Sequence, residues 1–165
     1  MKIAFGYKLR SGKDTAVDYL LKKYNGNRIT FAKPLYDSLH ATQKLFNFDI
    51  QKNREYLQIV GDWARNIDKD VFVSLALLNV NDSDNENYFC NDLRFLNEFN
   101  MLKKNNWTLI KIIRNHSKND NHQSEKELDN IDDKQWDYII LNNGTLEEFY
   151  DKIENVISKI KNKTI

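Results

Sequence analysis

The chain has 165 residues, and its 25 lysines and arginines nearly balance its 24 aspartates and glutamates, for a formal net charge of +1. This length is typical of one domain, and the charge balance argues against a protein whose main task is to grip nucleic acid. The sequence shows no apolar run long enough to cross a membrane, no signal peptide, and one cysteine, which cannot form an internal disulfide. We therefore expect a single domain in a reducing cytoplasm, with no membrane or nucleic-acid partner.

The amino-terminal stretch MKIAFGYKLRSGKDTAVDYLL, residues 1–21, combines a strand, a polar loop and a helix. A short apolar run ends at Gly6, a polar loop follows, and Gly12 and Lys13 precede apolar residues at helical spacing. Unpaired backbone N–H groups and the helix dipole make the start of a helix positive, and a lysine adds a full charge. This order of elements favours a polyphosphate ligand. The alternative is a surface turn that happens to contain Gly-Lys.

Two positions in this stretch depart from the usual phosphate-binding pattern. The pattern would place its first glycine at Tyr7, whereas the chain has it at Gly6, and Asp14 replaces the hydroxyl residue that usually follows the lysine. The displaced glycine changes how closely the loop would wrap a β-phosphate. Asp14 could reach Mg²⁺ directly or through water, with Thr15 as the alternative ligand.

The rest of the chain alternates short apolar strands with helices. We expect the first helix to end near Asn25-Gly26, further strands at about 28–31, 88–92, 107–113 and 136–141, and further helices at about 33–46, 52–66, 70–78, 95–105 and 145–160. The spacing of the second helix predicts an inward face of Leu35, Leu39, Thr42, Leu45 and Phe46. Thr145 and Glu148 form a capping box before the last helix. The order predicts an α/β fold, a five-stranded parallel sheet flanked by helices.

Charged residues follow three of the predicted strands. The ligand crevice of a parallel sheet lies beyond the carboxyl ends of its strands, so the phosphate-binding loop, Asp92–Arg94 and Arg114 are comparable places. Asp92 is placed to hold Mg²⁺ or its water, or to take a proton. Arg94 can point into the crevice or pair with Glu98 one turn along the next helix, and both interpretations stay open. Phosphoryl transfer needs positive charge around the moving group, and the candidate donors are Arg10, Lys13, Arg65 and Arg94.

Over nearly its whole length the chain resembles the deoxynucleoside monophosphate kinases of tailed phages and related viruses. The resemblance is carried, in order, by YKLRSGKDTAVDYLLKKY, FAKPLYDSL, GDWARNID, NDLRFLNE, HQSEKELD and LNNGTLEEFYDKI. RSGKDT and DLRFLNE are its most specific parts. It implies a P-loop NTPase fold of the nucleoside monophosphate kinase type, which transfers the γ-phosphate of ATP to a deoxynucleoside monophosphate. The host cytoplasm would be its location if the chain is viral.

The resemblance also implies roles for the matching residues. ATP and its Mg²⁺ would be held by Ser11, Gly12, Lys13, Asp14, Thr15 and Arg114, with Asp14 and Thr15 on the metal. The acceptor would be contacted by Lys8, Lys33, Arg65, Asp92, Arg94 and Glu98. Catalysis would rest on Arg10, Lys13, Asp92 and Arg94. Within a single domain of residues 1–165, the helical segment at about 33–79 would bind the acceptor, and a short lid at about 115–127 would lie near ATP.

Two other functions remain open at this stage. One is a different small P-loop kinase, acting on phosphomevalonate or dephospho-coenzyme A, because such enzymes share the loop and the sheet. The other is a nucleotide-binding protein without transferase activity. Three features favour it: the displaced glycine, Asp14, and the absence of arginine between Arg114 and the end of the lid. The preferred base, the sugar and the oligomeric state, a homodimer included, are not determined by the sequence.

Overall fold

The computed structural model describes residues 1–81, 86–115 and 127–163. The chain divides into two compact units, one made of Met1–Ile29 and Asp82–Ile165, and the other of Thr30–Asn81. The second unit covers almost the same range as the predicted acceptor-binding segment, whose role stays a prediction. Across the described part of the chain, no helix is both long and apolar enough to cross a membrane.

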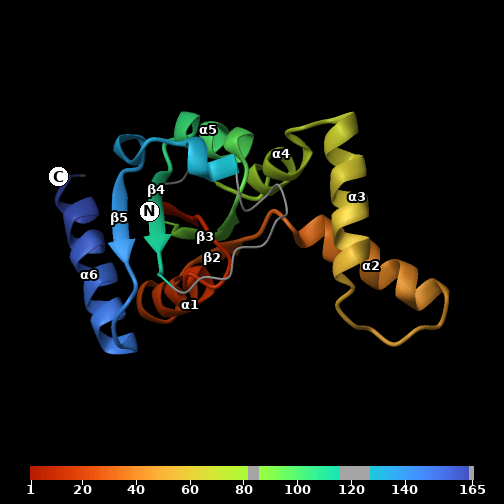
Figure 1. Cartoon of the computed structure of the whole chain (residues 1–165), viewed down its shortest axis with the longest axis horizontal. Helices are drawn as coiled ribbons and strands as arrows, with labels where there is room; N and C mark the ends of the chain where they lie inside the picture. The colour runs from red at the N-terminus through yellow and green to blue at the C-terminus, as the bar shows by residue number, and fades with distance from the viewer. Residues whose placement is uncertain (82–85, 116–126, 164–165) are drawn as a thin grey trace. The chain divides into compact units, whose positions relative to one another are not determined.

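The first unit is built on a five-stranded sheet with the strand order β2-β3-β1-β4-β5 (Figure 1). The strands are β1 (Lys2–Gly6), β2 (Asn27–Ile29), β3 (Tyr88–Leu93), β4 (Thr108–Ile113) and β5 (Tyr138–Leu141). All four neighbouring pairs run parallel, which confirms the predicted α/β sheet. Gly6 lies beside Leu93 of β3 and Lys111 of β4. The carboxyl ends of the three central strands therefore meet at the loop that follows β1.

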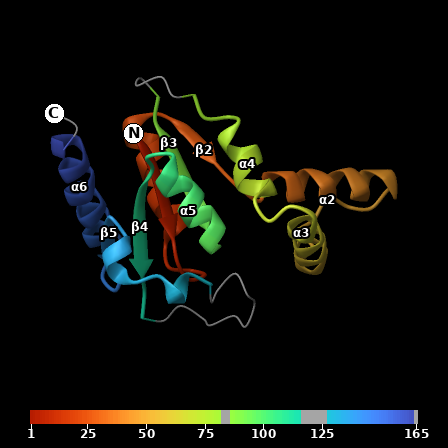
Figure 2. The same ribbon diagram turned by 90° about the horizontal axis from the view of Figure 1, so that it is seen from above.

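Three helices flank this sheet: α1 (Lys13–Tyr24), α5 (Leu96–Lys104) and α6 (Leu146–Lys163). Apolar residues of α1 and α6 share one core with β1 and β4, since their helical spacing places one stripe toward the alternating strand residues; the core includes Ile3, Phe5, Val17, Ile110, Phe149 and Ile153. Figure 1 shows α5 on the other side of the sheet, and Figures 1 and 2 both show α6 alongside β5. Two short 3₁₀ helices, η2 (Glu127–Asn130) and η3 (Asp133–Gln135), precede β5.

The predicted capping box at the start of α6 is confirmed. The Thr145 N–H donates to Glu148 Oε2 at 2.8 Å, and the Glu148 N–H donates to Thr145 Oγ1 at 3.2 Å. These bonds satisfy two donors that a helix start leaves without a partner.

The second unit consists of α2 (Lys33–Leu45), α3 (Arg54–Ile67) and α4 (Val71–Leu77). The Tyr56 hydroxyl of α3 lies 2.8 Å from Ser38 Oγ and 2.9 Å from Thr42 Oγ1 of α2. Figures 1 and 2 show these two helices side by side and crossing steeply. Asn53 caps α3 by accepting from the Tyr56 N–H at 2.9 Å.

The predicted inward face of α2 is wrong at its carboxyl end. Leu35 and Leu39 are buried, but Leu45 is 81% and Phe46 61% exposed. The helix ends at Leu45, beyond the part of α2 that Tyr56 holds, so helical periodicity no longer points these side chains at a neighbour. Phe46 stacks instead on Phe48, with ring centroids 5.8 Å apart.

Candidate functional site

The loop between β1 and α1 closes around the Lys13 side chain. The Lys13 ammonium is buried and donates to the carbonyl oxygens of Tyr7 at 2.9 Å and Lys8 at 2.5 Å. A full positive charge is thereby held at the first turn of α1, where the backbone N–H groups and the helix dipole already favour an anion. The arrangement has the electrostatics of a phosphate receptor.

The loop contains three residues with positive φ. Gly12 has a φ of 110°, and a Cβ at this position would lie 2.5 Å from Asn142 Nδ2, so both conformation and space require glycine. Tyr7 has a φ of 99° and Arg10 of 61°. Tyr7 therefore adopts a glycine-like backbone at the position where the pattern expects glycine.

The displaced glycine, Gly6, has a packing role. A Cβ there would lie 2.6 Å from the Trp136 ring, and Trp136 in turn packs edge-on against Phe99 of α5, with ring centroids 4.9 Å apart. Gly6 allows this aromatic layer to approach β1, while Tyr7 makes the turn.

Asn142 supports the loop from the end of β5. Its buried side-chain amide donates to the carbonyl oxygen of Ser11 at 2.8 Å. Sequence reasoning, which pointed to the ends of three other strands, missed this residue. The available signal was a polar residue directly after the fifth strand, where the ligand crevice of a parallel sheet lies.

A charged cluster on the same edge ties the loop to η2 and η3. Lys8 Nζ lies 2.5 Å from Asp129 Oδ2, and Lys111 Nζ lies 2.7 Å from Asp133 Oδ1. Lys111 Nζ also lies 4.2 Å from the centroid of the Tyr7 ring. Burial raises the pKa of Tyr7, helped by the charge and hydrogen bond of Asp129 and the charge of Asp133. Sequence reasoning missed Lys111 because it stands inside an apolar strand.

The two predicted metal ligands begin α1. Asp14 is exposed, and its carboxylate accepts a hydrogen bond from the Asn91 side-chain amide of β3; Thr15 is half-buried. Among the residues that the structure describes, no three His, Cys, Asp or Glu side chains gather into a metal-binding group. Mg²⁺ in nucleotide sites commonly takes one or two protein ligands and completes its shell with phosphate oxygens and water, which an Asp14–Thr15 site would suit.

Asp92 and Arg94 lie on the same edge as the loop, at the end of β3. The Cys90 thiol donates to Asp92 Oδ1 at 3.3 Å. Burial raises the pKa of Cys90 well above its ordinary value, and the charge of Asp92 adds to this effect. The thiol therefore stays protonated and orients the carboxylate.

Glu98 has a structural task. It is 2% exposed, and its Oε2 accepts from the backbone N–H groups of Arg94 at 2.9 Å and Phe95 at 3.0 Å. The carboxylate caps the start of α5 and fixes the backbone of Arg94. A direct contact between Glu98 and a substrate stays a prediction.

The other predicted site residues are spread over both units. Arg10 and Arg114 are exposed, and Arg114 follows β4 on the edge that holds the loop. In the second unit, Lys33 pairs with Asp37 at 2.5 Å and the Arg65 guanidinium lies 4.7 Å from the Phe72 ring centroid. The predicted lid falls mostly on residues 116–126, outside the described residues.

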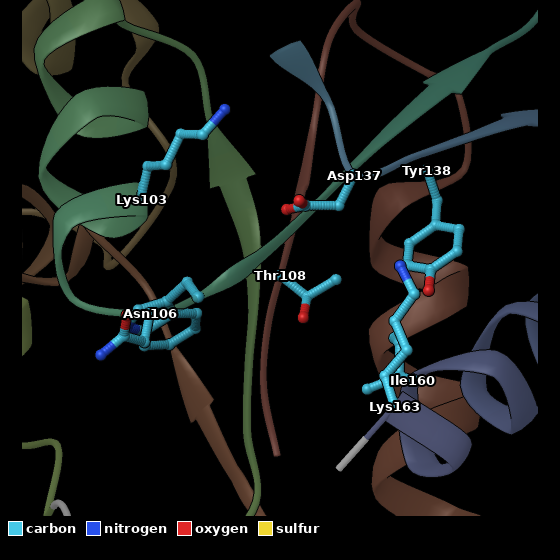
Figure 3. A pocket seen from close by; sticks show the side chains of 8 residues that line it. Lys103, Asn106, Thr108, Asp137, Tyr138, Ile160 and Lys163 are labelled. Carbon is cyan, nitrogen blue, oxygen red and sulfur yellow. The ribbon is translucent and has the colours of Figure 1, made fainter. Parts of the chain in front are cut away.

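A pocket of about 350 Å³ opens at the opposite edge of the sheet, near the beginnings of β4 and β5 (Figure 3). Both of its charged groups near the strand ends have partners within the fold: Lys103 Nζ donates to the Gln135 carbonyl oxygen at 2.7 Å, and Asp137 Oδ2 accepts from the Leu109 N–H at 2.7 Å. Parallel sheets bind ligands at the other edge, so we do not place the nucleotide here.

Comparisons with known proteins identify relatives of this chain. The family model for deoxynucleotide monophosphate kinases matches residues 53–153. A protein of Acanthamoeba polyphaga mimivirus, provisionally named a deoxynucleotide monophosphate kinase, is 32% identical over 87% of this chain and 89% of its own length. An uncharacterized protein of Ictalurid herpesvirus 1 (strain Auburn), ORF77, is 28% identical over 94% of this chain and 69% of its own.

A solved structure shows the same fold. Dephospho-CoA kinase from Campylobacter jejuni is similar with a TM-score of 0.53 and 18% identity over 100% of both chains. The fold is thus that of a P-loop kinase. Together with the match over residues 53–153 and the 32% identity to the mimivirus protein, it shows that the chain belongs to the deoxynucleotide monophosphate kinase family.

Proposed function

We propose that the protein transfers the γ-phosphate of ATP to a deoxynucleoside monophosphate. An oxygen of the acceptor phosphate forms a bond to the γ-phosphorus, the bond to the β–γ bridging oxygen breaks, and its electron pair stays on the β-phosphate of ADP. The products are ADP and a deoxynucleoside diphosphate. The observation that carries the proposal is the buried Lys13 ammonium inside a loop that opens α1, in a chain of this kinase family.

The loop and the first turn of α1 would hold ATP. The backbone N–H groups of Ser11 and Gly12 would face the phosphates at the start of α1. The Lys13 ammonium would turn to them as well, because the carbonyl oxygens that hold it are weaker partners than a polyphosphate. Asp14 and Thr15 would hold Mg²⁺, which neutralises charge that develops between the β- and γ-phosphates. Arg114 would lie near the nucleotide.

The acceptor phosphate would meet the cations beside this loop. Lys8 or Arg10 would lie between donor and acceptor, and Asp92 and Arg94 would border the acceptor pocket at the end of β3. Since the protein does little covalent chemistry in phosphoryl transfer, these side chains act through position and charge. On the unit Thr30–Asn81, Lys33 and Arg65 are the proposed acceptor contacts.

The test is a coupled ADP-release assay with dTMP, dGMP, dCMP and dAMP as separate acceptors, with dephospho-coenzyme A as a comparison. We expect turnover with at least one deoxynucleotide and none with dephospho-coenzyme A. Lys13→Ala is expected to lower turnover by about 10²-fold or more, as for the loss of a preorganised charge. Lys22→Ala, an exposed position on the same helix, is the matched control. Turnover with none of the four deoxynucleotides would disprove the proposal.

A further inference from the structure

We propose that Lys111 is a positioning residue for the phosphate-binding loop: it holds the Tyr7 ring and thereby keeps the strained start of the loop in the shape that binds ATP. The inference rests on the proposed function in one respect, that the loop binds ATP. It does not require the transfer reaction itself.

Tyr7 needs an external hold. Its φ of 99° is rare for a residue with a side chain, because the Cβ crowds its own backbone. Such a conformation persists where the surroundings over-determine it, and it is found most often at functional sites. We therefore expect the Tyr7 side chain to be fixed by its neighbours, of which Asp129 hydrogen-bonds it and Lys111 lies over its ring.

Lys111 supplies that hold from a rigid element. It stands on β4 directly beside Gly6, the residue that precedes Tyr7, and its ammonium lies 4.2 Å from the Tyr7 ring centroid. A cation at this distance over an aromatic ring is attracted to it, more strongly where water is excluded. Only 7% of the Lys111 side chain is exposed.

Asp133 fixes the ammonium in place. Its Oδ1 lies 2.7 Å from Lys111 Nζ, while 60% of the Asp133 side chain remains exposed. Burying a lysine side chain is costly, and its partner Asp133 stays largely in water, where an ion pair contributes little stability. A lysine here is therefore better explained by the ring that it contacts than by packing.

Tyr7 in turn contacts Lys13, the lysine proposed to bind phosphate. The Tyr7 carbonyl oxygen accepts from Lys13 Nζ at 2.9 Å. If the Tyr7 backbone leaves its positive φ, this carbonyl turns and the Lys13 ammonium loses its position. Lys111 thus acts on the phosphates through Tyr7 and Lys13, without touching them.

A double-mutant cycle on ATP affinity tests this route. The Kd for MgATP is measured calorimetrically for the wild type, Lys111→Met, Tyr7→Gly and the double variant. We expect Lys111→Met to raise the Kd about tenfold beside Tyr7, the scale of one desolvated cation–π contact. In the Tyr7→Gly background, where glycine adopts this φ without strain, Lys111→Met should alter the Kd by less than about twofold. Lys111→Arg, which keeps the cation, should stay within about threefold of the wild type.

An equal loss in both backgrounds would overturn the inference, since Lys111 would then act without Tyr7; so would no loss in either. If Lys111→Met does not fold, Tyr7→Leu and Tyr7→Phe both leave Lys111 in place, keep the strain and lose the hydroxyl that bonds Asp129, but only leucine removes the aromatic face. The leucine variant should have a Kd about tenfold higher than the phenylalanine variant, and equal Kd values would equally overturn the inference. Because the readout is binding, a protein that binds ATP without transferring phosphate fails the proposed function and leaves this cycle interpretable.

Discussion

The Asn142 side-chain amide donates a hydrogen bond of 2.8 Å to the carbonyl oxygen of Ser11, across 131 positions of the chain. This bond joins the end of the last strand to the loop after the first. A Cβ on Gly12 would run into the same amide at 2.5 Å. Asn142 therefore both shapes the loop and excludes any residue but glycine beside Lys13.

Truncating Asn142 should weaken ATP binding. Asn142→Ala leaves the buried Ser11 carbonyl without its donor, so we expect a loss of about 1–2 kcal/mol in unfolding free energy and a clear rise in the Kd for MgATP. Asn143→Ala is the matched control, because the Asn143 side chain also bonds a backbone group, accepting from the Asn115 N–H at 2.9 Å, but outside the loop. Equal ATP affinities of the two variants would contradict the role given to Asn142.

Strain at Tyr7 is measurable as a difference between two variants. Tyr7→Gly and Tyr7→Ala both lose the ring, but only alanine keeps the cost of a φ of 99°. The glycine variant should be the more stable by about 1 kcal/mol in urea unfolding. At Lys159, an exposed position within α6, the order should reverse, because alanine favours helix. An alanine variant at position 7 that is at least as stable as glycine would argue against strain.

Metal dependence should distinguish Asp14 from Thr15. Asp14 directly follows Lys13, the proposed phosphate contact, and carries a charge, so Asp14→Asn is expected to raise the Mg²⁺ concentration for half-maximal ATP binding by about tenfold. Thr15→Val, which keeps the shape of the side chain, should have the smaller effect. The reverse order would identify Thr15 as the direct ligand.

The contact between α1 and α6 should depend on pH through Glu154. Its carboxylate lies 2.7 Å from the Tyr24 hydroxyl and 2.8 Å from Lys23 Nζ. Burial opposes ionisation, but hydrogen bonds from Lys23, Tyr24 and Tyr19 outweigh it and lower the pKa of Glu154. A lowered pKa gives stability that is present above the ordinary carboxyl pKa and lost as the pH falls through the lowered value.

The wild type should therefore exceed Glu154→Gln by about 1 kcal/mol in unfolding free energy at pH 7, a modest value because the pair is partly exposed. The difference should shrink as the pH falls below the ordinary pKa of 4.5. Asp151→Asn, at an exposed position of the same helix, controls for the general effect of removing a carboxylate. A difference that persists unchanged to pH 3 would contradict this account.

Local patterns were enough for the order of elements and for the loop. Period-two and period-3.6 spacing are properties of neighbouring residues, so the five strands, the helix that begins at Lys13 and the capping box of Thr145 and Glu148 were predicted correctly. The same patterns failed at Leu45 and Phe46, because spacing says which face a side chain takes and not whether another element covers that face.

The sequence by itself determined a parallel α/β fold with a lysine-bearing loop after the first strand, because glycine, charge and periodicity act within a few residues. Only the tertiary structure decided that Tyr7 makes the turn expected of a glycine, that Gly6 makes room for Trp136, and that Asn142 and Lys111 contact the loop. The residues of each contacting pair lie far apart in the sequence, and their contacts form only when the strands come into register. A linear pattern records the residue types, but the distances between them arise only on folding.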